Sequence, residues 1–353
     1  MKESGVGQKA KRKSTIQAEW AALPEKELLK LRLRDLDLTI RDTWIERCVE
    51  SLHEELAREG LSVRPHVWLA DEWFSPDNTP GIAIPFYLAH PRLMKLERKM
   101  FLDIEGGTRR ECMQILRHEA GHVIQHSYNL QRRRKWQQTF GSSSQRYPTF
   151  YKPNPASRDY VQHLRRWYAQ SHPDEDFAET FAVWLTPRSS WRKHYESWPA
   201  LEKLRYVDEL MGEIAGKKPL LTKRLEVDPI KRSTKTLGEH YERKLAQIAV
   251  ETHTSFDRGL QKIFSSDEAH HNALPAATFI RRNRAAIMQL AEKWTGEYQV
   301  ALDGVLDELI NRCRVLNLRA HGSEAQMRSA LTTLLLKKAL RANTDNARRW
   351  YAV

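Results

Sequence analysis

Apolar side chains recur at the spacing of an α-helix along most of this 353-residue chain. The pattern begins at Pro24 with a run of leucines that ends near Leu38, and it continues from about 43 to 59 on a single helical face. Residues 131–160 are instead polar and rich in turn-forming residues, so we expect a long excursion over the surface or over a cleft. The same helical spacing predicts further helices at about 158–170, 173–185 and 188–216.

Two short stretches interrupt the helical pattern. Residues 63–70 and 82–88 are rich in β-branched and aromatic side chains and predict two strands, separated by a loop at 72–81. Pro85 in the second stretch cannot donate a hydrogen bond to a neighbouring strand. The second strand is therefore either an edge strand, whose free backbone groups could pair with an extended peptide, or a buried strand that has a proline at its end.

From Lys235 onward the sequence contains only amphipathic helical patterns, and these predict a bundle of helices. A kink is expected near Gly296 because glycine weakens a helix. The bundle helices are expected at about 237–264, 276–316 and 323–350. The whole chain is then of the α+β class, followed by an all-α part, and its expected divisions are a basic disordered tail (1–15), an α+β domain (16–220), a linker (221–234) and a basic helical domain (235–353).

The net charge of the chain is +13, because 58 Lys and Arg residues outnumber 45 Asp and Glu residues. Such an excess favours an anionic partner, although an ordinary solvated surface rich in Lys and Arg would also explain it. The three cysteines are far apart and form no C-x-x-C pair, which excludes a disulfide scaffold and a zinc ribbon. No apolar run approaches about 18 residues, and the first residues lack a secretory pattern, so we expect a cytoplasmic protein that does not span a membrane.

A helix start precedes the most informative motif of the chain. The glycine pair at 106–107 breaks the chain, and Thr108 followed by Glu111 fits a capping box. A helix should therefore begin near Arg109 and carry the sequence H-E-x-x-H at residues 118–122.

The motif predicts a metal site. Residues four apart share a helical face, so His118 and His122 can bind one metal ion. Glu119 is placed to take a proton from a metal-bound water and to pass it to the leaving amine. The alternative is a helix that carries a pair of surface histidines. Gly121 argues weakly against this alternative, because a glycine within a helix indicates close packing or access.

A zinc site needs a third protein ligand. The metzincin continuation fails, since Gln125 and Tyr128 stand where glycine and histidine are required. His126 lies one turn further along the same helix, and three histidines so spaced cannot converge on one ion. Glu175 and Glu179, in the pattern E-x-x-A-E-x-F-A, share a face of the helix at 173–185, so one can bind the metal while the other accepts the N–H of a ligand histidine. A favourable helix dipole explains acidic residues at the helix start, but not Glu179 among apolar residues.

His118 and His122, taken together with residues 168–182, resemble the bacterial family described as putative zinc-binding metallopeptidases. More broadly they are similar to the gluzincins, which are zincin-type peptidases with a glutamate as the third ligand. The similarity covers roughly residues 65–190. The sequence differs from many members of the family in lacking an N-terminal cysteine zinc ribbon.

The resemblance implies a zincin-like domain with a small sheet and an H-E-x-x-H helix. It implies that zinc is bound by the two histidines and Glu175, while Glu179 is the acid behind a ligand histidine. It also implies that Tyr168 points at the metal and stabilises the oxyanion, as a tyrosine does in some gluzincins.

The sequence therefore predicts a zinc-dependent metallopeptidase that hydrolyses peptide or protein substrates with a water activated by Glu119. Basic segments at 109–110, 132–135 and 165–166 flank the predicted site and either select an acidic substrate or form solvated helix ends. The alternative function is a basic module that binds nucleic acid or protein and holds a structural or vestigial zinc ion, with residues 235–353 as the interaction surface.

Overall fold

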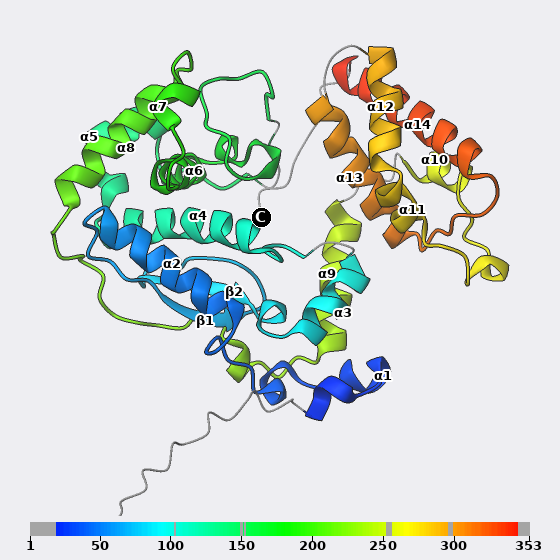
Figure 1. Ribbon diagram of the computed structural model, residues 1–353, viewed down its shortest axis with the longest axis horizontal. Coiled ribbons are helices and arrows are strands. Elements are labelled where there is room, and N and C mark those ends of the chain that lie inside the picture. The colour runs from blue at the N-terminus through cyan, green and yellow to red at the C-terminus, as the bar shows by residue number, and fades with distance from the viewer. Residues whose placement is uncertain are drawn as a thin grey trace, which may run out of the picture.

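The computed structural model describes residues 19–101, 104–148, 151, 153–251, 256–295 and 299–344. The basic tail expected at 1–15 and the kink expected near Gly296 lie outside these residues. Where the structure describes the chain, it is mostly helical with one small sheet, consistent with the α+β class (Figure 1). The strands are β1 (His66–Ala70) and β2 (Gly81–Pro85); the α-helices are α1 (Glu25–Leu28), α2 (Trp44–Arg58), α3 (Pro91–Phe101), α4 (Arg109–Ser127), α5 (Arg134–Phe140), α6 (Pro173–Leu185), α7 (Trp191–His194), α8 (Ala200–Ile214), α9 (Leu237–Glu251), α10 (Asp257–Gln261), α11 (Ala276–Arg282), α12 (Arg284–Thr295), α13 (Gln299–Val315) and α14 (Glu324–Thr344).

The two strands form a parallel pair in which His66 lies opposite Gly81 and Ala70 opposite Pro85. All five residues of β2 are buried, and Pro85 ends the strand. On the edge of β2 away from β1, the N–H of Ala83 donates to the carbonyl oxygen of Phe74 over 2.8 Å. The strand is thus buried with a proline at its end, and the loop before it already occupies part of its free edge.

Helix α4 is the central element of the first part of the molecule, and it packs against α6, α2 and β2 (Figure 1). The predicted helix start is confirmed, because the Thr108 hydroxyl caps α4 by accepting the N–H of Glu111 over 3.2 Å. The Glu111 carboxylate returns to the Thr108 hydroxyl, which donates to it over 3.0 Å, and not to the backbone N–H of a full capping box. The apolar face of α4 joins a core to which α2, both strands, α6 and α8 also contribute. This core fixes the direction of the helix that carries the H-E-x-x-H motif.

Two expected segments differ from the structure. The helix predicted at 158–170 is wrong apart from a 3-10 turn at Arg165–Gln170, because backbone groups of this segment bond to side chains of other elements and Trp167 has a left-handed φ of 52°. The excursion predicted at 131–160 begins with a short helix, α5, that buries two aromatic side chains. Trp136 and Phe140 lie four residues apart in α5 and pack on Phe177, with ring centroids 5.8 and 5.4 Å from that ring.

Other predicted helices exist but are divided. The run expected from Pro24 to Leu38 contains only α1 and a 3-10 turn at Leu33–Leu36. The helix expected at 188–216 is split into α7 and α8, because Pro199, which has no N–H, precedes the start of α8. The long helices expected after 237 appear as α9 to α14.

The C-terminal helices surround an apolar core of their own, which includes Leu260, Phe279, Leu306, Leu309 and Leu331. The start of α9 belongs instead to the first core, where Leu237 and Tyr241 are buried together with Ile230 from the segment before it. Figure 1 shows α9 beside α3, between the two groups of helices. Throughout the described residues, every helix is too short or too polar to cross a membrane.

Candidate metal centre

The two histidines of the motif point the same way from α4. The His118 side chain is 3% exposed and that of His122 is 12% exposed. Their Nε2 atoms lie 3.2 Å apart. This is the face-sharing geometry expected for residues one turn apart, and it brings one nitrogen of each ring to the same point.

Helix α6 brings a carboxylate to the same point. Glu175 Oε2 lies 3.0 Å from His118 Nε2 and 3.2 Å from His122 Nε2. Glu175 is in the first turn of α6, which begins with Pro173 and is capped by the ring of His172 accepting the N–H of Asp174 over 3.2 Å. His118, His122 and Glu175 each offer one atom to a cluster in which all atoms lie within 4.8 Å of one another.

Glu179 lies one turn further along α6 and faces the other side of His118. Its Oε1 accepts the Nδ1–H of His118 over 2.8 Å, and its Oε2 accepts the backbone N–H of Leu164 over 2.8 Å. Both oxygens therefore already accept a hydrogen bond, and neither accepts it from the atoms that converge in the cluster. Such a bond holds a proton on Nδ1 of His118 and leaves Nε2 as the nitrogen that is available to a metal ion.

Glu119 is buried beside the cluster with one oxygen that lacks a partner. Glu119 is the residue after His118, and its Oε2 makes no hydrogen bond among the described residues. Its charge raises the pKa of Tyr168 after the larger effects of burial and Glu175. Burial lowers the pKa of His122, Glu175 more than offsets this, and Glu119 adds a smaller increase. The carboxylate thus faces the cluster without belonging to it.

The charges of the cluster are strongly coupled. Burial by itself lowers the pKa of His118, but the hydrogen bonds that the Glu175 and Glu179 carboxylates accept from its ring outweigh burial and hold the pKa well above its ordinary value. Burial likewise raises the pKa of Glu175, but His122 and His118 more than offset it and hold the carboxyl ionised. The two carboxylates thus favour a positive charge on or between the histidine rings. Either a proton or a bound metal cation supplies that charge.

The residues fit zinc. Two imidazole nitrogens and one carboxylate oxygen are a donor set that zinc accepts, with a further position left for water. The unpartnered oxygen of Glu119 is a buried polar atom of the kind that a metal-bound water would satisfy.

Tyr168 lies against the cluster. Its ring centroid is 5.6 Å from that of His118, at an interplanar angle of 50°. Burial is the main cause of its raised pKa, so the hydroxyl stays protonated and can donate a hydrogen bond. Trp167, directly before it, is a buried residue in the left-handed region, a conformation that places Tyr168 and is sterically costly for a bulky side chain.

Sequence reasoning missed Tyr147. Its hydroxyl donates to Glu175 Oε1 over 2.9 Å, and its ring stacks on His172 with centroids 3.8 Å apart. The side chain is 44% exposed, so it lies at the opening of the cluster. It comes from the irregular segment after α5, which contains several aromatic residues, so nothing in the sequence distinguished Tyr147 from them.

His126 lies outside the cluster, as its position on the helix predicts. Its Nε2 is 3.3 Å from Asp77 Oδ1, and its Nδ1 is 3.3 Å from the side-chain amide of Gln131. Two of the flanking basic residues also have partners, since Arg133 pairs with Glu213 and Lys135 with Glu209, both at 2.6 Å. These two side chains belong to the contact between α5 and α8.

Comparison with known proteins finds a match in the part of the chain that holds the cluster. No curated protein and no solved structure matches the chain. Zinc is the cofactor that these findings indicate, since the matched family is described as zinc-binding and His118, His122 and Glu175 form a group that could hold a metal ion. Residues 105–196 match the model of the family described as "putative zinc-binding metallo-peptidase", the family that the H-E-x-x-H motif and the downstream glutamates indicate.

Proposed function

We propose that the protein is a zinc-dependent peptidase of the zincin type, in which His118, His122 and Glu175 bind the metal. The observation that carries the proposal is the convergence of two Nε2 atoms and one carboxylate oxygen from α4 and α6. Glu179 is unsuited to be the third ligand, because both of its oxygens already accept hydrogen bonds elsewhere. Its role is to orient His118.

When bound, zinc would act as a Lewis acid and lower the pKa of a coordinated water toward about 7. Glu119 takes the proton of the attacking water on its free oxygen and delivers it to the leaving amine. Tyr168, which stays protonated, donates a hydrogen bond to the oxyanion that develops on the substrate carbonyl. Tyr147 holds the outer oxygen of Glu175, so that the inner oxygen keeps its direction toward the histidines.

The substrate class that suits this chemistry is a peptide or protein. The C-terminal helices from α10 to α14 are proposed to form a separate domain, because they bury a core of their own.

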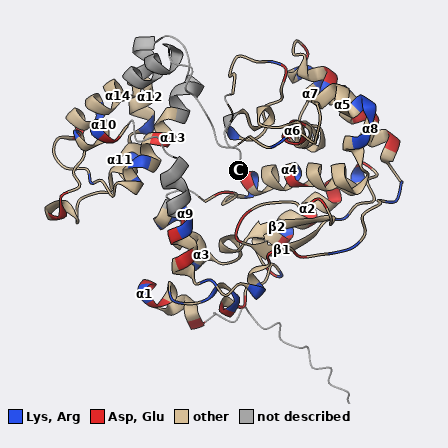
Figure 2. Cartoon of the chain, turned by 180° about the vertical axis from the view of Figure 1, so that it is seen from behind, with Lys and Arg blue, Asp and Glu red and all other residues tan. Residues whose placement is uncertain are grey.

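The charge distribution does not favour the alternative of a nucleic-acid-binding module, since Lys and Arg lie interspersed with Asp and Glu over both parts of the chain that the structure describes (Figure 2). A nucleic-acid surface instead gathers its basic residues on one face.

The test is cleavage of a peptide library by the wild-type protein and by Glu119→Gln, with zinc content measured in both. Glu119→Gln should retain zinc and lose activity by a factor of about 100 to 10,000, the usual contribution of a general base. Glu213→Gln, which changes an exposed glutamate on α8, serves as the control and should keep full activity. Equal cleavage by Glu119→Gln and the wild type would contradict the proposal.

A further inference from the structure

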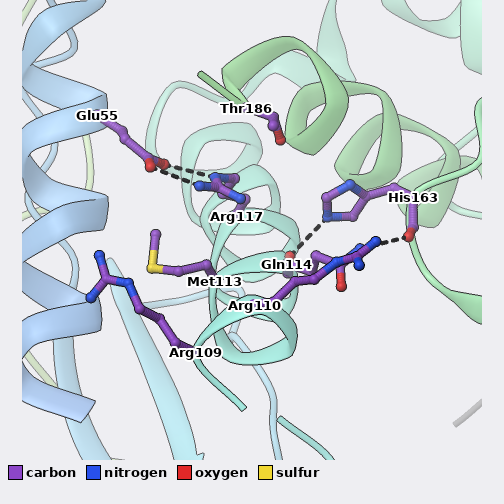
Figure 3. A pocket seen from close by; sticks show the side chains of 8 residues that line it. All are labelled: Glu55, Arg109, Arg110, Met113, Gln114, Arg117, His163 and Thr186. Carbon is purple, nitrogen blue, oxygen red and sulfur yellow. Dashed lines mark hydrogen bonds and ion pairs between the residues drawn. The ribbon is translucent and has the colours of Figure 1, made fainter. Parts of the chain in front are cut away.

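A cavity of about 620 Å³ lies between α2, the first turns of α4 and the end of α6. It contains none of the metal-cluster residues. Its volume falls in the range of about 300 to 1,000 Å³ that small-molecule sites occupy. The residues that line it are Glu55, Arg109, Arg110, Met113, Gln114, Arg117, His163 and Thr186 (Figure 3).

The cavity has a surplus of positive charge. Arg117 is neutralised by Glu55, to which it donates two hydrogen bonds of 2.8 and 2.7 Å. Arg109 donates to the neutral hydroxyl of Ser51 over 3.0 Å, and no acidic partner offsets its charge among the described residues. Arg110 has no hydrogen bond or ion pair with any residue that the structure describes. The lining therefore carries two uncompensated guanidinium groups.

The arrangement of these groups suits an anion of more than one acidic group. Figure 3 shows Arg109 on the side of α2 and Arg110 beside Gln114 and His163, with Met113 between them. Both arginines are in the first turn of α4, where the helix dipole adds to their positive charge. A planar guanidinium binds phosphate or carboxylate through two parallel N–H donors, which gives Arg its preference for such ligands.

We propose that this cavity binds an organic anion that carries phosphate or carboxylate groups, with Arg109 and Arg110 as the two anchors. The site adjoins the metal centre through His163 and Leu164. The ring of His163 bonds to the Gln114 carbonyl at 2.9 Å, and the next residue donates to Glu179. The proposal does not depend on the peptidase function, because none of the residues that line the cavity belongs to the metal cluster.

The test is titration of the full-length protein with inorganic pyrophosphate and with citrate by isothermal calorimetry. The double variant Arg109→Gln/Arg110→Gln should weaken binding of at least one anion by about tenfold or more, since it removes both guanidinium anchors and their charge-assisted hydrogen bonds. Preference for pyrophosphate would identify a phosphate ligand, and preference for citrate a carboxylate ligand.

The matched control is Arg281→Gln/Arg282→Gln, which removes another adjacent pair of exposed arginines, at the end of α11. It should bind both anions as the wild type does. Binding should also persist in His122→Ala, which separates this cavity from anion binding at the metal. Three results would overturn the proposal: neither anion binds the wild type, the two double variants lose anion binding equally, or anion binding is lost in His122→Ala alone.

Discussion

The backbone of α4 meets the backbone of α6 at Gly121 and Ala178. A Cβ atom placed on Gly121 would lie 2.8 Å from the Cα of Ala178, which is closer than real Cβ contacts allow, and a tight 3.2 Å from its carbonyl oxygen. The glycine lies between His118 and His122, and Ala178 lies between Glu175 and Glu179. The close approach of the two helices is therefore what brings the two pairs of side chains together.

Substitution at Gly121 should push the helices apart. Gly121→Ala should destabilise the protein by about 1 to 2 kcal/mol, because overpacking costs about 1 to 3 kcal/mol and the better helix propensity of alanine returns up to about 1 kcal/mol. Zinc affinity should fall as well. Chemical denaturation and a chelator competition measure the two effects.

The matched control for this prediction is Gly212→Ala in α8, where a Cβ atom meets nothing within 4 Å. Alanine there should leave zinc binding unchanged and stabilise the protein by up to about 1 kcal/mol. If Gly121→Ala instead leaves zinc binding unchanged and stabilises the protein as Gly212→Ala does, the contact between α4 and α6 has space for a methyl group.

Removal of the Tyr147 hydroxyl should weaken zinc binding while leaving the fold intact. Tyr147→Phe keeps the ring that stacks on His172 but removes the donor to Glu175 Oε1. We expect zinc affinity to drop by up to about tenfold, the lower end for partners of metal ligands. Tyr128→Phe is the control, because it removes a 2.9 Å hydrogen bond to the Lys217 carbonyl far from the cluster. Equal zinc affinity in the two variants would exclude a role for the Tyr147 hydroxyl.

Glu179 should matter to the metal without binding it. Glu179→Gln keeps the shape of the side chain but removes the charge that holds His118 Nδ1–H. Zinc affinity should fall by about 10- to 100-fold, yet zinc should still bind at saturating concentration. Complete loss of zinc in this variant, with retention in Glu175→Gln, would reverse the roles given to the two carboxylates.

His240 should make stability depend on pH. Its side chain is 3% exposed, Nε2 has no partner among the described residues, and burial lowers its pKa to about 4. The folded protein thus binds fewer protons than the unfolded chain, whose histidine has a pKa of about 6.5. This contribution is complete above pH 6.5 and is lost as the pH falls from about 6.5 toward 4. The ring packs on Phe86, and the charged groups around it are Asp71, Lys235, Arg243 and Lys244.

The measurement is the free energy of unfolding at several pH values for the wild type and for His240→Gln. The wild type should lose about 1 to 3 kcal/mol more than the variant between pH 7 and pH 4, which is the range that a shift of this size allows. Parallel curves for the two proteins would show that His240 titrates normally in the fold.

Much of the metal centre follows from local sequence patterns. The capping box at Thr108, the four-residue spacing of His118 and His122, and the same spacing of the two glutamates on α6 each depend on residues within one or two helical turns. Helical periodicity also explains why Gly121 could be recognised as a point of close packing. The sequence predicts these features because a helix fixes the relative directions of such neighbours.

The features that could not be predicted depend on irregular backbone and distant contacts. Tyr147 reaches Glu175 from a segment without periodic pattern, and the N–H of Leu164 is bound by a side chain of α6. Trp167 adopts a left-handed conformation that its side chain disfavours, so local propensity predicted a helix there instead. Tertiary contacts outweigh local preference at these positions.

Zinc content of the purified protein tests the central claim most directly. The wild type should contain one zinc ion per chain by elemental mass spectrometry, as expected for a site of three protein ligands. Glu175→Gln should lose most of it under the same conditions, while the exposed control Glu213→Gln should keep it. Wild-type protein that takes up no zinc, or Glu175→Gln that holds as much zinc as the wild type, would contradict the assignment of His118, His122 and Glu175 as the metal site.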